Sequence, residues 1–176
     1  VFVMSTPMAG GNDIDCEPGI HAVTFDDIRW DYCNVKAITL LPNVLLRQQA
    51  VDADAAEAIL IRNGFATEGA ASNLFIIDHD LLITPPKGPT LLPGITRDLI
   101  LELAANHGIP FREADIPLEQ LREAGEIWLT SSTREISPVT RLDERSIGGG
   151  KPGPHWQRMI AIYRQYTDAV RNGNAS

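Results

Sequence analysis

The feature of this sequence that most restricts its fold is the irregular order of its strand-like and helix-like segments. Short apolar runs predict strands at residues 1–5, 20–25, 58–62, 73–77, 81–84, 109–116, 126–130 and 136–142. Apolar residues at helical spacing predict helices at residues 41–58, from 95 to the His107-Gly108 pair, at 118–123 and at 154–170. Because strands and helices do not alternate one by one, this order favours a mixed α/β (α+β) fold over a doubly wound parallel sheet.

Two dipeptides predict tight turns within this pattern. Asn63-Gly64 follows one strand, and His79-Asp80 separates two strands that we expect to form a hairpin. At roughly 100–200 residues per domain, the 176 residues predict a single domain, with a frayed tail at residues 172–176.

The charge balance excludes some classes of partner. The chain has 15 Lys+Arg against 23 Asp+Glu, a net charge of −8, which argues against nucleic acid and anionic membranes. Because apolar runs stay far below the ~20 residues of a membrane span and no leader pattern opens the chain, we expect a cytoplasmic protein. Cys16 and Cys33 predict reduced thiols, and the singly scattered histidines predict no metal site.

The most tempting literal motif is G-G-G-K-P-G at residues 148–153, which satisfies G-x-G-x-x-G. A dinucleotide site needs a hydrophobic strand before the glycines and a ribose-binding acid about twenty residues later. Residues 143–146 are polar instead, and Asp168 falls inside the last predicted helix. Pro152 also stands where a P-loop needs Ser or Thr. We therefore predict no nucleotide site here.

Four other motifs, in order along the chain, carry a resemblance. They are R-W-D-Y-C-N-V-K at residues 29–36, R-N-G-F-A-T-E-G-A-A-S-N-L-F at 62–75, L-P-G-I-T-R at 92–97 and T-S-S-T-R-E-I-S-P-V at 130–139. Together they resemble the class IV (fold-type IV) pyridoxal-phosphate aminotransferases, and most closely the D-amino-acid transaminases. Branched-chain aminotransferases and aminodeoxychorismate lyase are relatives. The likeness covers nearly the whole chain.

The resemblance implies the fold and a set of site residues. It implies that residues 1–176 are the large cofactor-binding domain and that the family's small N-terminal domain is missing. Lys36 would form the Schiff base with the cofactor, and Glu68 would pair with the ring nitrogen. Further cofactor-binding positions would be Asn73, Leu92, Gly94, Ile95, Thr96, Ser131 and Ser132, with backbone amides at the start of a helix holding the phosphate.

Some positions depart from the family. Ala70 and Ala71 stand where D-amino-acid transaminases often have serines, so hydrogen bonds made there cannot be carried over. The missing domain would supply an arginine to the phosphate and most of the substrate-carboxylate trap. We therefore expect the truncated chain to be inactive without it.

The implied reaction is transamination between a D-amino acid such as D-alanine and a 2-oxo acid, in a homodimer that uses pyridoxal 5'-phosphate. Lys36 would move a proton between the substrate Cα and the cofactor. Three alternatives remain at this point: a branched-chain aminotransferase, an aminodeoxychorismate-lyase-type enzyme that releases pyruvate without an amino acceptor, and a non-catalytic domain.

Overall fold

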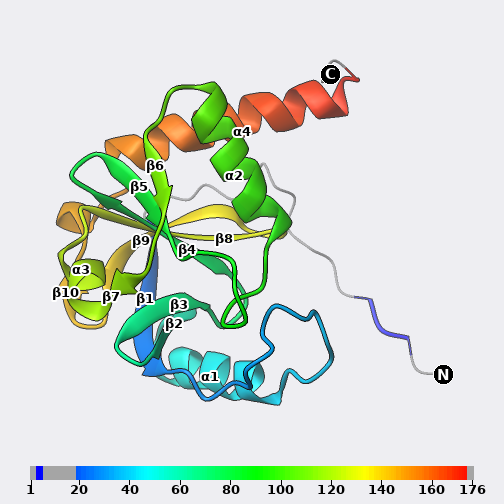
Figure 1. Cartoon of the computed structure of the whole chain (residues 1–176), viewed down its shortest axis with the longest axis vertical. Coiled ribbons are helices and arrows are strands. Elements are labelled where there is room, and N and C mark those ends of the chain that lie inside the picture. Colours follow the sequence, from blue (N-terminus) through cyan, green and yellow to red (C-terminus); the bar gives the residue numbers. More distant parts are fainter. Residues whose placement is uncertain (1–2, 6–18, 174–176) are drawn as a thin grey trace.

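The computed structural model describes residues 3–5 and 19–173, and its elements are shown in Figure 1. In chain order they are β1 (Ile20–Asp26), α1 (Leu41–Asp52), β2 (Glu57–Arg62), β3 (Phe65–Gly69), β4 (Asn73–Asp78), β5 (Leu81–Thr84), α2 (Ile95–Asn106), β6 (Phe111–Glu113), β7 (Ile116–Pro117), α3 (Leu118–Glu123), β8 (Glu126–Ser131), β9 (Glu135–Leu142), β10 (Arg145–Ser146), a 3₁₀ turn at Gly148–Gly150 and α4 (Pro154–Arg171).

The described strands form one ten-stranded mixed sheet in the order β6-β5-β4-β8-β9-β1-β2-β3-β7, with β10 paired to β9. β1 runs parallel to both of its neighbours, β2 and β9, and β5 runs parallel to β6. The other pairs are antiparallel. Mixed pairing in one sheet confirms the predicted mixed α/β class.

The sheet curls until its two ends approach each other. β6 and β7 lie at opposite ends of the strand order, yet Ala114 and Asp115 are the two residues between them in the chain. An inner cluster of apolar side chains, which includes Ala22, Ile59 and Leu74, therefore draws residues from strands all around the sheet.

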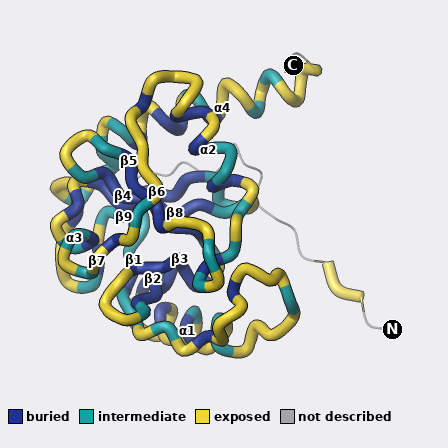
Figure 2. Tube along the Cα trace, in the orientation of Figure 1, coloured by how far each residue is buried: buried dark blue, intermediate teal, exposed yellow. Residues whose placement is uncertain are grey.

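Alternation along each strand sends the remaining apolar side chains outward. In β4, Leu74 and Ile76 belong to the inner cluster, whereas Phe75 and Ile77 pack with α2 and α4. In β2, Ala58 and Leu60 pack instead with Leu46 and Ala50 of α1. Helices thus cover two separate outer regions of the curled sheet, and Figure 2 shows the buried strands surrounded by exposed loops and helix faces.

The two predicted tight turns are confirmed, and their backbone explains the residue choice. Asn63 and Gly64 have φ of 53° and 82°, and His79 and Asp80 have φ of 46° and 65°. Two successive left-handed residues make a turn whose twist matches that of the flanking strands. The helix predicted after Gly94 is also confirmed as α2, and Gly108, with φ 63°, follows its end.

Several predicted boundaries were wrong. The helix predicted over residues 41–58 ends at Asp52, because Asp54 takes a left-handed φ of 54° and the chain turns into β2 at Glu57. The strand predicted at 1–5 is absent from residues 3–5, which are exposed and irregular, and residues 1–2 lie outside the described residues.

Two further differences concern the sheet. The single strand predicted over 109–116 is divided into β6 and β7, which pair with β5 and β3 respectively. β3 itself, which carries Glu68, was not predicted as a strand. The predicted frayed tail lies largely outside the described residues.

None of the helices that the structure describes is both long enough and apolar enough to cross a membrane.

Candidate active site

Arg29 lies at the centre of a buried network of charges just beyond the end of β1. Its Nε donates to Asp27 Oδ1 at 2.9 Å, its Nη2 donates to Asp27 Oδ2 at 2.9 Å, and its Nη1 donates to Glu68 Oε1 at 2.5 Å. Nη2 also donates to the carbonyl of Thr90 at 3.1 Å. The side chains of Arg29, Asp27 and Glu68 are 4%, 0% and 6% exposed, so these charges interact with little screening by water.

The network shifts the pKa values of its members. Burial would raise the pKa of Asp27, but hydrogen bonds and charge from Arg29, with help from Arg62, hold it below its ordinary value. Burial would lower the pKa of Arg29, but Asp27 and Glu68 together raise it. Both side chains are therefore charged at neutral pH.

Glu68, on β3, is held by donors from three separate parts of the chain. Oε1 accepts from Arg29, while Oε2 accepts from the Leu92 amide at 3.0 Å and from Asn73 Nδ2 at 3.1 Å. Burial raises the pKa of Glu68 to about 7, against the opposing charge and hydrogen bond of Arg29. An ionised carboxylate offers about four acceptor positions, so the three bonds leave one position for a further donor.

Asn73 joins this carboxylate to the segment before α2. Its Nδ2 also donates to the carbonyl of Leu92 at 2.8 Å. A Cβ on Gly94 would lie 2.0 Å from Asn73 Oδ1, so the close approach requires glycine at residue 94. The structure thus brings the predicted residues Glu68, Asn73, Leu92 and Gly94 together.

The start of α2 offers backbone amides to an anion. Gly94 is its N-cap residue, and no described side chain caps the first turn. The amides of Ile95 and Thr96 therefore have no acceptor within the helix, and the helix dipole favours negative charge beside them. Ile95 has its side chain exposed, whereas Thr96 is buried.

The strand pairing places the end of β8 beside Asn73. Thr130 is the partner of Asn73 across β4 and β8, and its buried Oγ1 has no hydrogen-bond partner among the described residues. Ser131 follows at the end of the strand, where its Oγ accepts from the Arg134 amide at 3.2 Å, and Ser132 is exposed in the next turn. No described hydrogen bond joins Ser131 or Ser132 to Thr96.

Lys36 lies in the loop of residues 27–40, and its side chain is exposed. Within the described part of the chain this side chain makes no hydrogen bond or ion pair. The loop itself is fastened: Arg62 Nη2 donates to the carbonyls of Arg29 and Trp30 at 2.9 and 3.2 Å, and the Cys33 amide donates to Pro89 at 2.8 Å.

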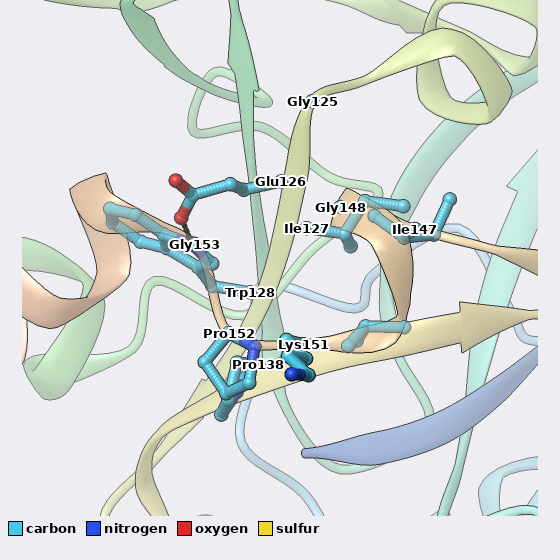
Figure 3. Close-up of a pocket in the computed structure, with 11 residues that line it drawn as sticks. Gly125, Glu126, Ile127, Trp128, Pro138, Ile147, Gly148, Lys151, Pro152 and Gly153 are labelled. Carbon is cyan, nitrogen blue, oxygen red and sulfur yellow. Dashed lines mark hydrogen bonds between the residues drawn. The ribbon is translucent and has the colours of Figure 1, made fainter. Parts of the chain in front are cut away.

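The carboxylate of Glu126, on β8, lies beside the glycine-rich segment at residues 148–153. Glu126 accepts from the amides of His155 and Trp156 at the start of α4, at 2.9 and 2.8 Å, and from the Trp128 indole at 3.0 Å. Figure 3 shows this carboxylate directed at the segment that contains Gly153. Glu126 therefore occupies the position at the start of α4 where a helix N-terminus would otherwise bind a phosphate.

Sequence reasoning missed several members of this site. Arg29 was part of a motif but had no role, and neither Asp27 nor Thr130 was singled out. Two acids and an arginine directly after the apolar run of β1 were an available signal, since charges at a strand end can turn inward when they pair. That they are buried could not be read from the sequence.

This domain joins a curled mixed sheet, a buried carboxylate with an open acceptor position and uncapped helix amides. Such a site can hold a small molecule that has both a hydrogen-bond donor and an anionic group. Comparison with known proteins narrows the class to which this domain belongs. The family model described as amino-transferase class IV matches residues 2–142. The chain belongs to the class IV aminotransferases.

Individual relatives agree with this assignment. The chain is 42% identical over 136 residues to a D-alanine aminotransferase of Bacillus licheniformis, a match over 77% of this chain and 48% of that protein. It is similar in fold to a branched-chain aminotransferase from the archaeon Thermoproteus uzoniensis, solved with norvaline, with TM-score 0.75, 26% identity and coverage of 92% of this chain and 54% of that chain.

A branched-chain amino acid aminotransferase from Escherichia coli is also similar, with TM-score 0.73, 30% identity and coverage of 90% of this chain and 54% of that chain. The chain spans about half the length of the curated relatives it matches.

The family implies pyridoxal 5'-phosphate, and the described residues fit that group. Glu68 keeps one acceptor position that a protonated ring nitrogen would fill. Thr130 Oγ1 is a buried hydroxyl without a partner among the described residues. Thr130 is the strand partner of Asn73, whose side chain meets Gly94 at the uncapped start of α2, where a phosphate would bind. The cofactor-binding and catalytic roles of all the predicted site residues stay predictions: Lys36, Glu68, Asn73, Leu92, Gly94, Ile95, Thr96, Ser131 and Ser132.

Proposed function

We propose that the intact protein is a pyridoxal-phosphate-dependent transaminase that transfers the amino group of a D-amino acid, such as D-alanine, to a 2-oxo acid. The observation that carries the proposal is the buried Glu68 carboxylate with three donors in place and one acceptor position open. The relatives named D-alanine aminotransferase, 36–43% identical over most of this chain, support the choice of substrate.

Several of the predicted residues would have distinct tasks in this reaction. The bound cofactor would supply an electron sink that accepts the electron pair of the C–H bond broken at the substrate Cα. Glu68 would accept the N–H of the ring, and the α2 amides with Thr96, Ser131 and Ser132 would hold the phosphate. Lys36 Nζ would hold the cofactor until the substrate amine displaces it. As a free amine it would then take the Cα proton as general base and deliver it to the cofactor side as general acid.

Chemical labelling tests the role of Lys36. Borohydride reduction of the full-length, cofactor-loaded protein, followed by peptide mapping, should place the added mass on Lys36. Lys87, which pairs with Asp98 at 2.8 Å, and Lys151 serve as internal controls. Label on either of these lysines in place of Lys36 would refute the assignment.

A branched-chain substrate is the second candidate, because the structural relatives include branched-chain aminotransferases. An assay of amino-group transfer distinguishes the two candidate functions. Transfer from D-alanine would support the D-amino-acid transaminase, and transfer from L-leucine would support the branched-chain aminotransferase. A lyase on the same scaffold would instead release pyruvate without any added 2-oxo acid. A non-catalytic domain would give no product in any of these assays.

We also propose that the intact protein is a homodimer. Large apolar side chains are exposed on the loop that carries Lys36 and along α1, and we call them the α1 surface: Ile28, Trp30, Tyr32, Val35, Ile38, Leu40, Leu41, Val44, Leu45 and Val51. This many exposed large apolar side chains on one helix and the loop before it are typical of an interaction surface.

A further inference from the structure

The burial of the charged side chains of Arg29 and Asp27 has an unfavourable free energy. Removing two charges from water costs several kcal/mol per ion, and well-packed apolar residues often serve stability as well or better. A buried pair of this kind therefore calls for a reason other than packing. The reason suggested by the geometry is the third member of the group, Glu68, which Arg29 contacts directly.

We propose that Arg29, aimed by Asp27, is a positioning residue that keeps the Glu68 carboxylate ionised and leaves its one open acceptor position for the cofactor's ring nitrogen. This inference rests on the proposed function, because it assigns the cofactor to that position.

The hydrogen bonds show how Arg29 is aimed. Asp27 accepts from Nε and Nη2 through both of its oxygens, which fixes the plane of the guanidinium. Nη1 then points to Glu68 Oε1, while the Leu92 amide and Asn73 hold Oε2 from the other side. A lysine would keep the positive charge but could not bridge the two carboxylates in this planar arrangement.

The surrounding charges show why Asp27 belongs to the arrangement. The charged and titratable groups near Glu68 are Arg29, Asp27, Arg62 and the Cys33 thiol. Among the buried and partly buried groups, two guanidinium groups and two carboxylates cancel. Asp31, which Arg62 also contacts at 2.9 Å, is 89% exposed and screened by water, so the network is close to neutral before a cofactor binds. Without Asp27 the two arginines would outweigh Glu68, and a positively charged ring would be attracted less strongly.

The ionisation of Glu68 gives the direct measurement. Burial raises its pKa and Arg29 opposes that rise, so removal of Arg29 should move the Glu68 pKa further upward. Infrared difference spectra of the cofactor-free, full-length protein, with Glu68→Gln as reference, follow this carboxyl group between its protonated and ionised forms. In Arg29→Gln we expect Glu68 to stay protonated at about pH 7.5, whereas in the unmodified protein it is largely ionised.

Cofactor binding gives the second measurement. Loss of one charge-assisted hydrogen bond should weaken the affinity for pyridoxal 5'-phosphate about ten- to a hundredfold at that pH, with partial recovery at higher pH. Arg29→Lys should restore the ionisation of Glu68 and part of the affinity. Arg112→Gln removes an exposed arginine from β6 and should change neither quantity.

The possible outcomes separate the inference from the proposed function. A folded Arg29→Gln protein in which Glu68 titrates as in the unmodified protein would overturn the inference, even if that enzyme transaminates normally. If Arg29→Gln does not fold, the Asp27→Asn variant tests the inference instead. We expect this variant to bind the cofactor about tenfold more weakly, and unchanged cofactor binding would overturn the inference. Failure of the unmodified full-length protein to bind the cofactor would overturn the proposed function.

Discussion

At the scale of single residues, the state of Glu68 is a property of the folded chain. Its donors come from the loop after β1, from β4 and from the segment before α2, and no two of these are neighbours in sequence. The acid becomes distinctive only when folding brings these three segments together. Its ionisation should therefore appear in the pH dependence of stability.

The first prediction concerns that pH dependence. Burial raises the Glu68 pKa from 4.5 to about 7, so the folded protein binds this proton more tightly than the unfolded chain does. The resulting stabilisation is complete below pH 4.5 and is lost as the pH rises through 7, with an upper bound of about 3 kcal/mol. Urea unfolding of the cofactor-free protein should show this fall, and Glu68→Gln should flatten it.

Glu119→Gln is the matched control for that measurement, because the Glu119 side chain is 73% exposed. It should leave the slope of stability against pH unchanged. Equal slopes for the unmodified protein and Glu68→Gln would contradict the prediction.

The second prediction concerns the contact between Gly94 and Asn73. The Gly94 backbone is ordinary, with φ −72° and ψ 139°, so alanine is disfavoured by the approach of its Cβ to within 2.0 Å of Asn73 Oδ1 and not by backbone strain. We expect Gly94→Ala to lower the free energy of unfolding by about 1–3 kcal/mol. In an Asn73→Ala background the same change should cost much less, which a double-mutant cycle measures.

Gly88→Ala is the control, since nothing lies within 4 Å of a Cβ at Gly88. Additive losses from Gly94→Ala and Asn73→Ala would show that the two residues do not interact and would refute the prediction.

Some residues of the site could be predicted from the sequence and others could not. Glu68, Asn73, Leu92 and Gly94 were predicted through a family resemblance, and the structure joins them through direct contacts. Arg29 could not be given a role, because an arginine after a strand is usually solvated and its partner lies 39 positions away. Long-range pairing of this kind leaves no local pattern.

At the scale of elements, the start of α4 depends on a carboxylate from a different element. Glu126, on β8, accepts from two amides of the first turn of α4 and from the Trp128 indole. Substitution by alanine would leave these buried donors without an acceptor. We expect Glu126→Ala to lower the free energy of unfolding by about 2–4 kcal/mol.

Chemical denaturation measures that loss, and Glu123→Ala, at an exposed position on α3, is the comparison. Glu126→Gln keeps one acceptor oxygen and should cost less than Glu126→Ala. Similar stability for Glu126→Ala and Glu123→Ala would show that the carboxylate does not support the helix.

Elements with local signals were the ones that the sequence could predict. Pro154 begins α4 and Gly108 follows α2, while the turns at residues 63–64 and 79–80 have residues suited to left-handed backbone. The residues of β3 have no apolar strand pattern of their own, although the Asn63-Gly64 turn precedes them, and nothing local marks the division of β6 from β7. β3 pairs with β2 through the Asn63-Gly64 turn, and β6 and β7 are separate strands because they pair with β5 and β3 at the two ends of the curled sheet.

At the scale of the whole molecule, the α1 surface gives a prediction about assembly. Leu41 and Val44 are 69% and 59% exposed on α1. We expect the full-length protein to sediment as a dimer and the double variant Leu41→Glu, Val44→Glu to dissociate at least about tenfold more readily, because each charge would be buried without a partner.

Val170→Glu, at a half-exposed position on α4 away from this surface, should leave the dimer intact. A full-length protein that sediments as a monomer at micromolar concentration would contradict the proposal. So would a dimer that the α1 substitutions leave unchanged.

The division of the outer side chains into two regions has a consequence for local unfolding. The α1 cluster and the α2/α4 cluster share no residue, and α1 contributes two buried residues, Leu46 and Ala50, where α2 contributes six. In the double variant Leu41→Glu, Val44→Glu, where no partner covers the α1 surface, amide hydrogens of α1 should therefore exchange with solvent sooner than those of α2 and β8. An opening of that region would release the chain next to Lys36 while Asn73 and Gly94, on the slower side, keep their contact.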